Sequence, residues 1–396
     1  MELRTRWGAV AALFIAGVVV ALQIGKAAIA VPVLQQELAL SLVVASWVIG
    51  AYGVLGAVAG LPAGIVASLF SARRTLIAGL LASGLGSLAG AFVSDGSLLI
   101  VTRVIEGGGF LTAVLALPRL LRAVTAVKDR DTVLAVWGAY MPIGSVIMMV
   151  AGPHLMAAGW QTLWIVNGVI VLAYAAVVAF LPLPDEAQPA GVLRTVMPNI
   201  KAALGSPGPI LLALAFGIYT FQYAAMANLL PTLLVDRLGL SIAAAGTISA
   251  ITVAANAVGN VFAGALLRFG APFWAVAAFA YCFVGVAGFG VFSENLPVVL
   301  IAALASASLA VTGLIPASIF AAAPRFAPTS ALLAIVLGLL NQTSNLGNLF
   351  GPAAMATVVK HFGWDGAPYL FVGVTACGLT VALMLRAAMK HARTSP

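Results

Sequence analysis

Twelve long apolar segments constrain the fold of this chain more than any other feature of its sequence. Each has about 20 residues or more and few charges, the length that an α-helix needs to cross the ~30 Å hydrocarbon core of a bilayer. We therefore expect an all-α membrane protein with twelve transmembrane helices. The segments cover residues 8–33, 43–69, 75–94, 97–122, 132–157, 162–183, 208–234, 242–267, 273–293, 296–321, 329–358 and 366–387.

The composition agrees with a membrane protein. Of the 396 residues, 63% are hydrophobic and 8% are charged, whereas soluble domains carry roughly 25% charged residues. At about 33 residues for each helix and loop, the twelve helices fill the chain and leave no room for a soluble domain. The first apolar segment is longer than the apolar region of a signal peptide, so we expect a retained helix there.

Lysine and arginine residues are distributed unequally between the two ends of the segments. With the N-terminus in the cytoplasm, fifteen of them flank cytoplasmic ends, and only Arg237 and Lys360 flank external ends. Cytoplasmic loops of membrane proteins carry this excess of positive charge. The sequence therefore predicts a multi-pass protein of the bacterial inner membrane with both termini in the cytoplasm.

The two halves of the chain repeat each other at an offset of about 200 residues. The polar stretch 184–206 divides the segments six and six, so we expect bundles at 1–183 and 207–396 with a cytoplasmic linker between them. The matching positions are Pro32 and Pro231, 38–41 and 238–241, 63–64 and 263–264, 70–72 and 269–271, Thr112 and Thr312, 152–153 and 351–352, and 159–160 and 363–364.

Parallel six-helix repeats are how major facilitator transporters are built, and several motifs resemble that superfamily. The segment from Gly64 to Arg73 and Arg74 resembles the family's loop after helix 2, although Ser68, Leu69 and Ser71 replace the usual Asp, Arg and Gly. This resemblance implies gating or structural roles for Gly64, Arg73 and Arg74. The Asp that anchors the family's usual latch has no counterpart at Ser68.

Two further segments resemble superfamily motifs. Residues 103–107, Arg-Val-Ile-Glu-Gly, resemble the Arg-x-x-Gln-Gly of helix 4, and Gly152-Pro153 resembles the Gly-Pro motif of helix 5. The resemblance implies two pseudo-symmetric six-helix halves, a gating or structural role for Gly152 and Pro153, and alternating access to a site at mid-membrane. Within the superfamily, residues 137–142 and 230–233 resemble the cyanate and nitroimidazole transporter branch, which suggests a small anionic substrate.

Three charged residues lie inside apolar segments: Lys26, Arg103 and Glu106. Each costs roughly 2.5–3.5 kcal/mol at the centre of a lone membrane helix, so we expect them to face protein. Lys26 lies ~10 Å and Glu106 ~13 Å from the outer ends of their helices at 1.5 Å per residue, so these two side chains can pair. Arg103 shares a helix face with Glu106.

The charged trio has two interpretations. The repeat-related positions, near Ala303, Ser306 and Ala225 or Met226, are uncharged, which favours a role in transport over one in folding. Two cations and one carboxylate then favour an anionic substrate, bound by Lys26 and Arg103, with Glu106 as the proton-coupling group. Alternatively, Lys26 and Arg103 extend toward the membrane surface and Glu106 packs beside them.

Polar stripes on other helices supply further candidates for substrate contact. Uncharged polar residues also join membrane helices by hydrogen bonds, and the two roles are equally compatible with the pattern. Another stripe, at Thr252, Asn256 and Asn260, ranks lower as a substrate contact. In the family that this chain resembles, helices 1, 4, 7 and 10 line the cavity, and this stripe is on helix 8. The candidate substrate contacts are Gln23, Tyr140, Tyr219, Gln222, Tyr223, Asn341 and Asn345.

The sequence has no nucleotide-binding or hydrolytic motif, and its two cysteines and three histidines are scattered. We therefore expect no enzyme activity, cofactor, metal or nucleic-acid partner. The predicted function is secondary transport of a small, anionic solute by a monomer in the lipid bilayer, with Glu106 as the candidate group for coupling to protons. Proton-driven drug efflux and a transport-dead sensor or assembly protein on the same fold are the alternatives.

Overall fold

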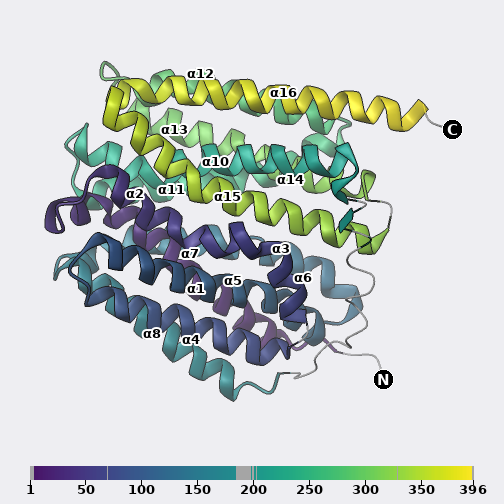
Figure 1. Cartoon of the computed structure of the whole chain (residues 1–396), viewed down its shortest axis with the longest axis horizontal. Helices are drawn as coiled ribbons and strands as arrows, with labels where there is room; N and C mark the ends of the chain where they lie inside the picture. The colour runs from purple at the N-terminus through teal and green to yellow at the C-terminus, as the bar shows by residue number, and fades with distance from the viewer. Residues whose placement is uncertain are drawn as a thin grey trace. The chain divides into compact units, whose positions relative to one another are not determined.

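The structure is a computed structural model that describes residues 4–68, 70–183, 198, 200–201, 203–327 and 329–394. Every regular element in these ranges is a helix (Figure 1). The α-helices are α1 (Trp7–Glu37), α2 (Leu42–Gly50), α3 (Val54–Ser68), α4 (Ala72–Ala91), α5 (Gly96–Val124), α6 (Arg130–Trp137), α7 (Tyr140–Met156), α8 (Trp160–Phe180), α10 (Pro207–Asp236), α11 (Ile242–Arg268), α12 (Phe273–Val291), α13 (Val298–Thr312), α14 (Leu314–Ala322), α15 (Ser330–Phe362) and α16 (Ala367–Thr394). Short 3-10 turns are η1 (Ala51–Gly53), η2 (Val127–Asp129), η3 (Ala323–Arg325) and η4 (Trp364–Gly366).

The helices coincide with the predicted membrane segments, and the all-α membrane fold is confirmed. Within the described residues, ten helical stretches are long and apolar enough to span a bilayer, and α7 is a shorter apolar helix. The long α15 covers the remaining predicted segment, with four amide side chains at 341, 342, 345 and 348 in its middle.

Two of the predicted segments are broken where the apolar pattern shows no interruption. Helix α6 ends at Trp137 and α7 begins at Tyr140, while α13 ends at Thr312 and α14 begins at Leu314. A proline follows each break, at Pro142 and Pro316. Proline lacks the N–H of the helical ladder and its ring clashes with the carbonyl four residues earlier, which disrupts the helix at that point.

The chain forms two compact units. One contains residues 1–190 and 240–250, and the other contains residues 191–239 and 251–396. Most of the predicted linker 184–206 lies outside the described residues, so the predicted domain boundaries stay a prediction.

In the first unit, α4 packs against both α5 and α8 (Figure 1). Glycines permit the close approach: a Cβ atom at Gly79 would lie 2.7 Å from the carbonyl oxygen of Gly109, and one at Gly168 would lie 3.0 Å from that of Gly84. Small residues at helix crossings are the usual way in which membrane helices pack closely. The close packing brings the polar faces of α4, α5 and α8 near α1.

The second unit has a continuous apolar core. Its buried side chains come from α10, α11, α12, α14, α15 and α16 and include Tyr281 and Leu340. The buried phenol of Tyr281 donates to the carbonyl oxygen of Ala215 at 2.6 Å, which ties α12 to α10. The polar atom of this buried ring thus has a partner within the apolar core.

Replacing Gly107 with alanine is expected to destabilise the first unit by about 1–3 kcal/mol. A Cβ atom at this position would overlap the backbone carbonyl of Tyr52, which cannot move without shifting η1. The matched control is Gly108→Ala, because its Cβ would meet only the flexible side chain of Leu55. Thermal unfolding in detergent measures both variants, and equal melting temperatures would contradict the packing argument.

Candidate functional site

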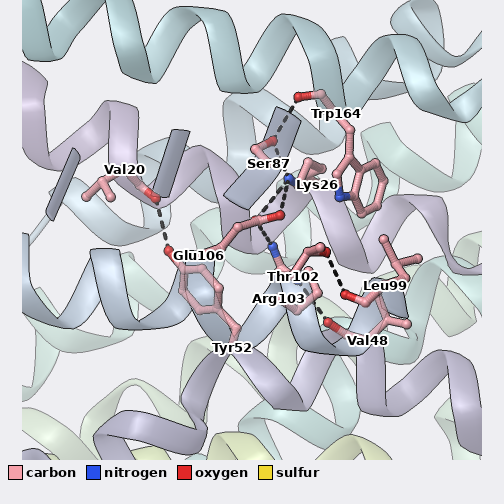
Figure 2. Close-up of polar contacts among 10 residues, drawn as sticks. All are labelled: Val20, Lys26, Val48, Tyr52, Ser87, Leu99, Thr102, Arg103, Glu106 and Trp164. Carbon is pink, nitrogen blue, oxygen red and sulfur yellow. Dashed lines mark hydrogen bonds and ion pairs between the residues drawn. The ribbon is translucent and has the colours of Figure 1, made fainter. Parts of the chain in front are cut away.

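The three charged residues of the predicted trio meet in the first unit and form one buried ion cluster (Figure 2). Lys26 Nζ on α1 lies 3.1 Å and 3.0 Å from the two carboxylate oxygens of Glu106 on α5. Arg103, one turn before Glu106, donates to the same carboxylate. The pairing predicted from the depth of the residues is confirmed. The side chains of Lys26 and Glu106 are 0% exposed and that of Arg103 is 1% exposed, so neither cation extends to the surface.

Further hydrogen bonds connect the cluster to three more helices. Lys26 Nζ donates to Ser87 Oγ on α4 at 2.8 Å, and Ser87 Oγ donates to the carbonyl oxygen of Trp164 on α8 at 2.8 Å. Arg103 Nε donates to the carbonyl oxygen of Val48 on α2 at 2.9 Å. An ammonium group has three N–H donors, and those of Lys26 have three acceptors here. The lysine is therefore fully satisfied in this conformation.

Two aromatic rings lie against the cations. Lys26 Nζ is 4.4 Å from the centre of the Trp164 ring, and the Arg103 guanidinium is 4.6 Å from the centre of the Tyr52 ring. Both distances are within the range of a cation–π interaction. The phenol of Tyr52 donates to the carbonyl oxygen of Val20 at 3.2 Å, which fixes the ring in place. The rings stabilise the cations without adding negative charge.

The local sequence leaves room for the cluster. Arg103 and Glu106 are three residues apart on α5, which places both side chains on one face. Opposite them, α4 has no side chain at Gly86, where a Cβ atom would come 3.1 Å from Glu106 Cγ. Glycine at this point therefore lets Glu106 lie flat against α4 and reach Lys26.

The cluster holds two cations and one carboxylate, so its formal charge is positive when all three are ionised. Among the described residues, Lys26 and Arg103 form ion pairs with no other carboxylate. Charges in a buried site of low dielectric interact strongly and are weakly screened. A site with this net charge can attract an anion.

The predicted contacts in α1 and α7 lie apart from the ion pairs. Gln23 is one turn from Lys26 on α1 and is fully buried, and neither atom of its amide has a partner among the described residues. The ring of Tyr140 stacks on that of Trp137 with 4.1 Å between centroids. Buried amides without partners are rare in folded proteins, so Gln23 remains a candidate for contact with a ligand or water.

In the second unit, the predicted residues of α10 and α15 differ in their partners. Gln222 is 1% exposed and its amide has no partner among the described residues. Tyr219 donates to Asn256 at 3.4 Å, and its ring lies tilted against that of Tyr223 with 5.9 Å between centroids. On α15, Asn345 donates to the carbonyl of Asn341, in its own helix, at 2.8 Å. Gln222 is thus the least satisfied of these candidates.

Gln23 and Gln222 are 199 residues apart, the same offset as Pro32 and Pro231. The sequence repeat therefore relates two buried glutamines, and both lack partners among the described residues. This correspondence is visible in the sequence but was not among the predicted repeat pairs. It strengthens both residues as candidates.

The lower-ranked stripe on α11 joins helices. Asn256 Nδ2 donates to the carbonyl oxygen of Leu309 on α13 at 2.9 Å, and Thr252 lies 3.1 Å from the hydroxyl of Ser306. These bonds satisfy polar groups inside the second unit, which is the packing role of such residues in membrane helices.

The residues predicted to act in gating lie at helix ends and crossings. Gly64 is in the last part of α3, and Leu69 of the same motif lies outside the described residues. Arg73 donates to the carbonyl oxygen of Ala179 at 2.5 Å, and Arg74 follows the N-cap Ser71, which accepts from its backbone N–H at 3.3 Å. Arg73 therefore ties α4 to the end of α8.

The Gly-Pro pair lies in the last part of α7. Gly152 is buried in α7, where a Cβ atom would come 2.9 Å from the side chain of Ile29 on α1. Pro153 follows it within the same helix. The pair therefore lies at a close crossing of α1 and α7.

Sequence reasoning missed the uncharged partners of the cluster. Ser87, Trp164, Tyr52 and the carbonyl of Val48 all contact Lys26 or Arg103. A lone serine or aromatic residue in an apolar helix gives no signal by itself. Only the depth argument used for Lys26 and Glu106 could have selected Ser87, which lies on a neighbouring helix.

Most of the chain matches a known family of membrane proteins. The sequence model of the Major Facilitator Superfamily matches residues 13–332 and 212–396. The chain belongs to this superfamily. It is therefore a multi-pass membrane protein of a transporter superfamily.

Three relatives illustrate the range of the matches. A 3-(3-hydroxy-phenyl)propionate transporter of Escherichia coli is 28% identical over 64% of this chain and 63% of its own length. A puromycin resistance protein of Streptomyces alboniger is 29% identical over 53% of this chain and 42% of its own length. A multidrug resistance protein B homologue of Mycobacterium tuberculosis is 35% identical over 34% of this chain and 26% of its own length. The chain thus spans less than two thirds of the length of each relative.

Solved structures share the fold. A bacterial homologue of the human lysosomal transporter Spinster superposes with a TM-score of 0.80 over 99% of both chains, at 12% identity. A D-xylose–proton symporter gives a TM-score of 0.75 over 95% of this chain and 96% of its own, at 15% identity. These likenesses establish the fold alone. The resemblance to the cyanate and nitroimidazole branch gains no support from the relatives described above and stays a prediction.

Proposed function

We propose that this superfamily member carries a small organic anion across the bacterial inner membrane as a monomer with both termini in the cytoplasm. The observation that carries the proposal is the buried cluster of Lys26, Arg103 and Glu106, in which two cations share one carboxylate. The relative from Escherichia coli is named as a transporter of an aromatic propionate, which is a small carboxylate. The positive charge of the cluster and the substrate named for this relative therefore favour the same class of substrate, a small organic anion.

The cluster suggests how an anion and a proton could be coupled. In this conformation Glu106 pairs with both Lys26 and Arg103. All three N–H donors of Lys26 have acceptors, so none is left for a substrate. A proton added to Glu106 removes its negative charge, so the two cations then favour another carboxylate in its place. Release of the substrate anion lets Glu106 lose the proton and pair again with Lys26 and Arg103. Proton and anion thus move in the same direction.

Purified protein should be stabilised by small aromatic carboxylates. A ligand that binds the folded state raises the melting temperature by mass action. We expect phenylpropionate or benzoate to raise the melting temperature of the wild-type protein, and neutral phenylpropanol, which lacks the carboxylate, to leave it unchanged. Stabilisation by cationic or neutral drug-like compounds alone would overturn the anion proposal.

Transport in proteoliposomes should respond to pH with a defined sign. If proton and anion move together, uptake rises when the outside is more acidic than the lumen, and a protonophore abolishes this stimulation. The measurement is the initial rate of labelled phenylpropionate uptake at equal and unequal pH. Uptake stimulated by an alkaline exterior would contradict the coupling described above.

Drug efflux is the second candidate, and the names of two relatives favour it. The aromatic rings of Phe216, Tyr219 and Tyr223 on α10 could contact a flat lipophilic compound. Export of puromycin from proteoliposomes, with no effect of aromatic acids, would favour this candidate. Absence of any flux would favour the transport-dead alternative.

A further inference from the structure

A cavity of about 370 Å³ lies at one end of the second unit. It is formed by the connection between α11 and α12, the end of α14 with η3, and α16. The predicted orientation places these helix ends on the cytoplasmic side. The lining residues that matter here are Leu267, Ala271, Phe273, Trp274, Arg325 and Arg386.

Two arginines line this cavity and lie against aromatic rings. The guanidinium of Arg325 is 5.8 Å from the centre of the Phe273 ring, and that of Arg386 is 4.6 Å from the centre of the Trp274 ring. Neither arginine forms an ion pair with a carboxylate among the described residues. A guanidinium on a flat ring keeps its N–H donors free for a planar or tetrahedral anion. The cavity therefore carries two cations without a described counter-ion.

The first turn of α12 adds a third attraction for an anion. The helix begins at Phe273, after Pro272, and no side chain caps it. The first N–H groups of a helix have no partner within the helix, and its dipole places partial positive charge there. Phe273 and Trp274 both line the cavity, so this helix end and the two arginines converge on one space.

An apolar cavity adjoins the basic one. It has a volume of about 570 Å³ and runs between α11, α12 and α13. Ala271 lines both cavities, and the lining passes from Leu267 to Leu266 on α11 and from Trp274 to Ala275 on α12. The side chains around the apolar cavity include Phe262 and Phe279, which are 59% and 58% exposed on the outer surface. The combined space is therefore basic at the end lined by Arg325 and Arg386 and apolar along the rest.

We infer that this space binds an anionic phospholipid. Its phosphate would lie between Arg325, Arg386 and the start of α12, and an acyl chain would follow the apolar cavity. A free phosphate would use only the basic part, whereas a phospholipid uses both. Basic pockets between helices on the cytoplasmic side are suited to acidic headgroups, because anionic lipids concentrate in that leaflet.

Native mass spectrometry of the detergent-purified full chain tests this inference. The protein is mixed with phosphatidylglycerol or with phosphatidylcholine of the same acyl chains, and the lipid-bound fraction is measured. We expect wild-type protein to bind phosphatidylglycerol at least tenfold more tightly than phosphatidylcholine, and the double variant Arg325→Gln/Arg386→Gln to lose this preference. Both arginines are exposed, so the substitutions leave the core intact.

The matched control is Arg268→Gln, because Arg268 is an exposed arginine at the end of α11 that does not line the cavity. This variant should keep the preference for phosphatidylglycerol. Inorganic phosphate at millimolar concentration should not displace the lipid, because it lacks an acyl chain. Equal binding of the two lipids, an unchanged preference in the double variant, or displacement by inorganic phosphate would each overturn the inference.

Discussion

Replacing Glu106 with glutamine is expected to destabilise the first unit by about 3–5 kcal/mol, the usual cost of leaving a buried charge without its partner. The substitution keeps the size of the side chain but removes the only carboxylate that pairs with Lys26 and Arg103 in the described structure. Two like charges then face each other where neither is exposed. We expect a marked fall in melting temperature in detergent and little protein in the membrane.

The control for this prediction is Ser87→Ala. It removes one neutral partner of Lys26 and leaves both ion pairs in place. A hydrogen bond to a charged group contributes about 1.5–3 kcal/mol, so this variant should lose less stability than Glu106→Gln. If Glu106→Gln unfolds at the wild-type temperature, Lys26 or Arg103 has lost its charge or found another partner. The cluster would then not be the net-positive site on which the anion proposal rests.

The sequence predicts the cluster well because burial of charge in a membrane leaves few options. Lys26, Arg103 and Glu106 lie in apolar segments, and their distances from the helix ends put Lys26 and Glu106 at similar depth. Neither fact depends on the rotation of the helices. The alternative in which Lys26 and Arg103 extend to the surface is wrong for this conformation, because both are held by Glu106 and by contacts on α2, α4 and α8.

Polar stripes are harder to interpret because spacing alone does not tell which partner an amide has. Asn345 bonds to the backbone of its own helix, and Asn256 bonds to α13, although both belong to regular stripes. Gln222 looks similar in the sequence but lacks a partner among the described residues. The difference arises from helix rotation and from side-chain rotamers, which apolar periodicity does not specify. The helix breaks before Pro142 and Pro316 are hidden for a related reason, since the apolar run continues through them.

Replacing Lys26 with methionine is expected to separate transport from folding. The variant keeps the Arg103–Glu106 pair and changes the formal charge of the cluster from positive to neutral. Methionine fills the space of the lysine stem with a flexible apolar chain. One oxygen of Glu106 loses its partner, which costs about 1–3 kcal/mol, less than the expected cost of Glu106→Gln.

Uptake of phenylpropionate by this variant should fall by about tenfold or more, because the cluster loses its net positive charge. A tenfold fall requires the loss of only about 1.4 kcal/mol of binding free energy for the anion. The matched variant is Lys26→Arg, which keeps the positive charge beside Glu106 and the ring of Trp164 and should retain part of the uptake. Initial rates are compared at equal amounts of reconstituted protein, with melting temperatures measured on the same samples. Normal uptake by Lys26→Met would show that the charge of Lys26 serves folding alone, and the anion would then need a different site. Loss of uptake in Lys26→Met, with partial recovery in Lys26→Arg and similar melting temperatures in both, would instead place the positive charge itself in the transport step.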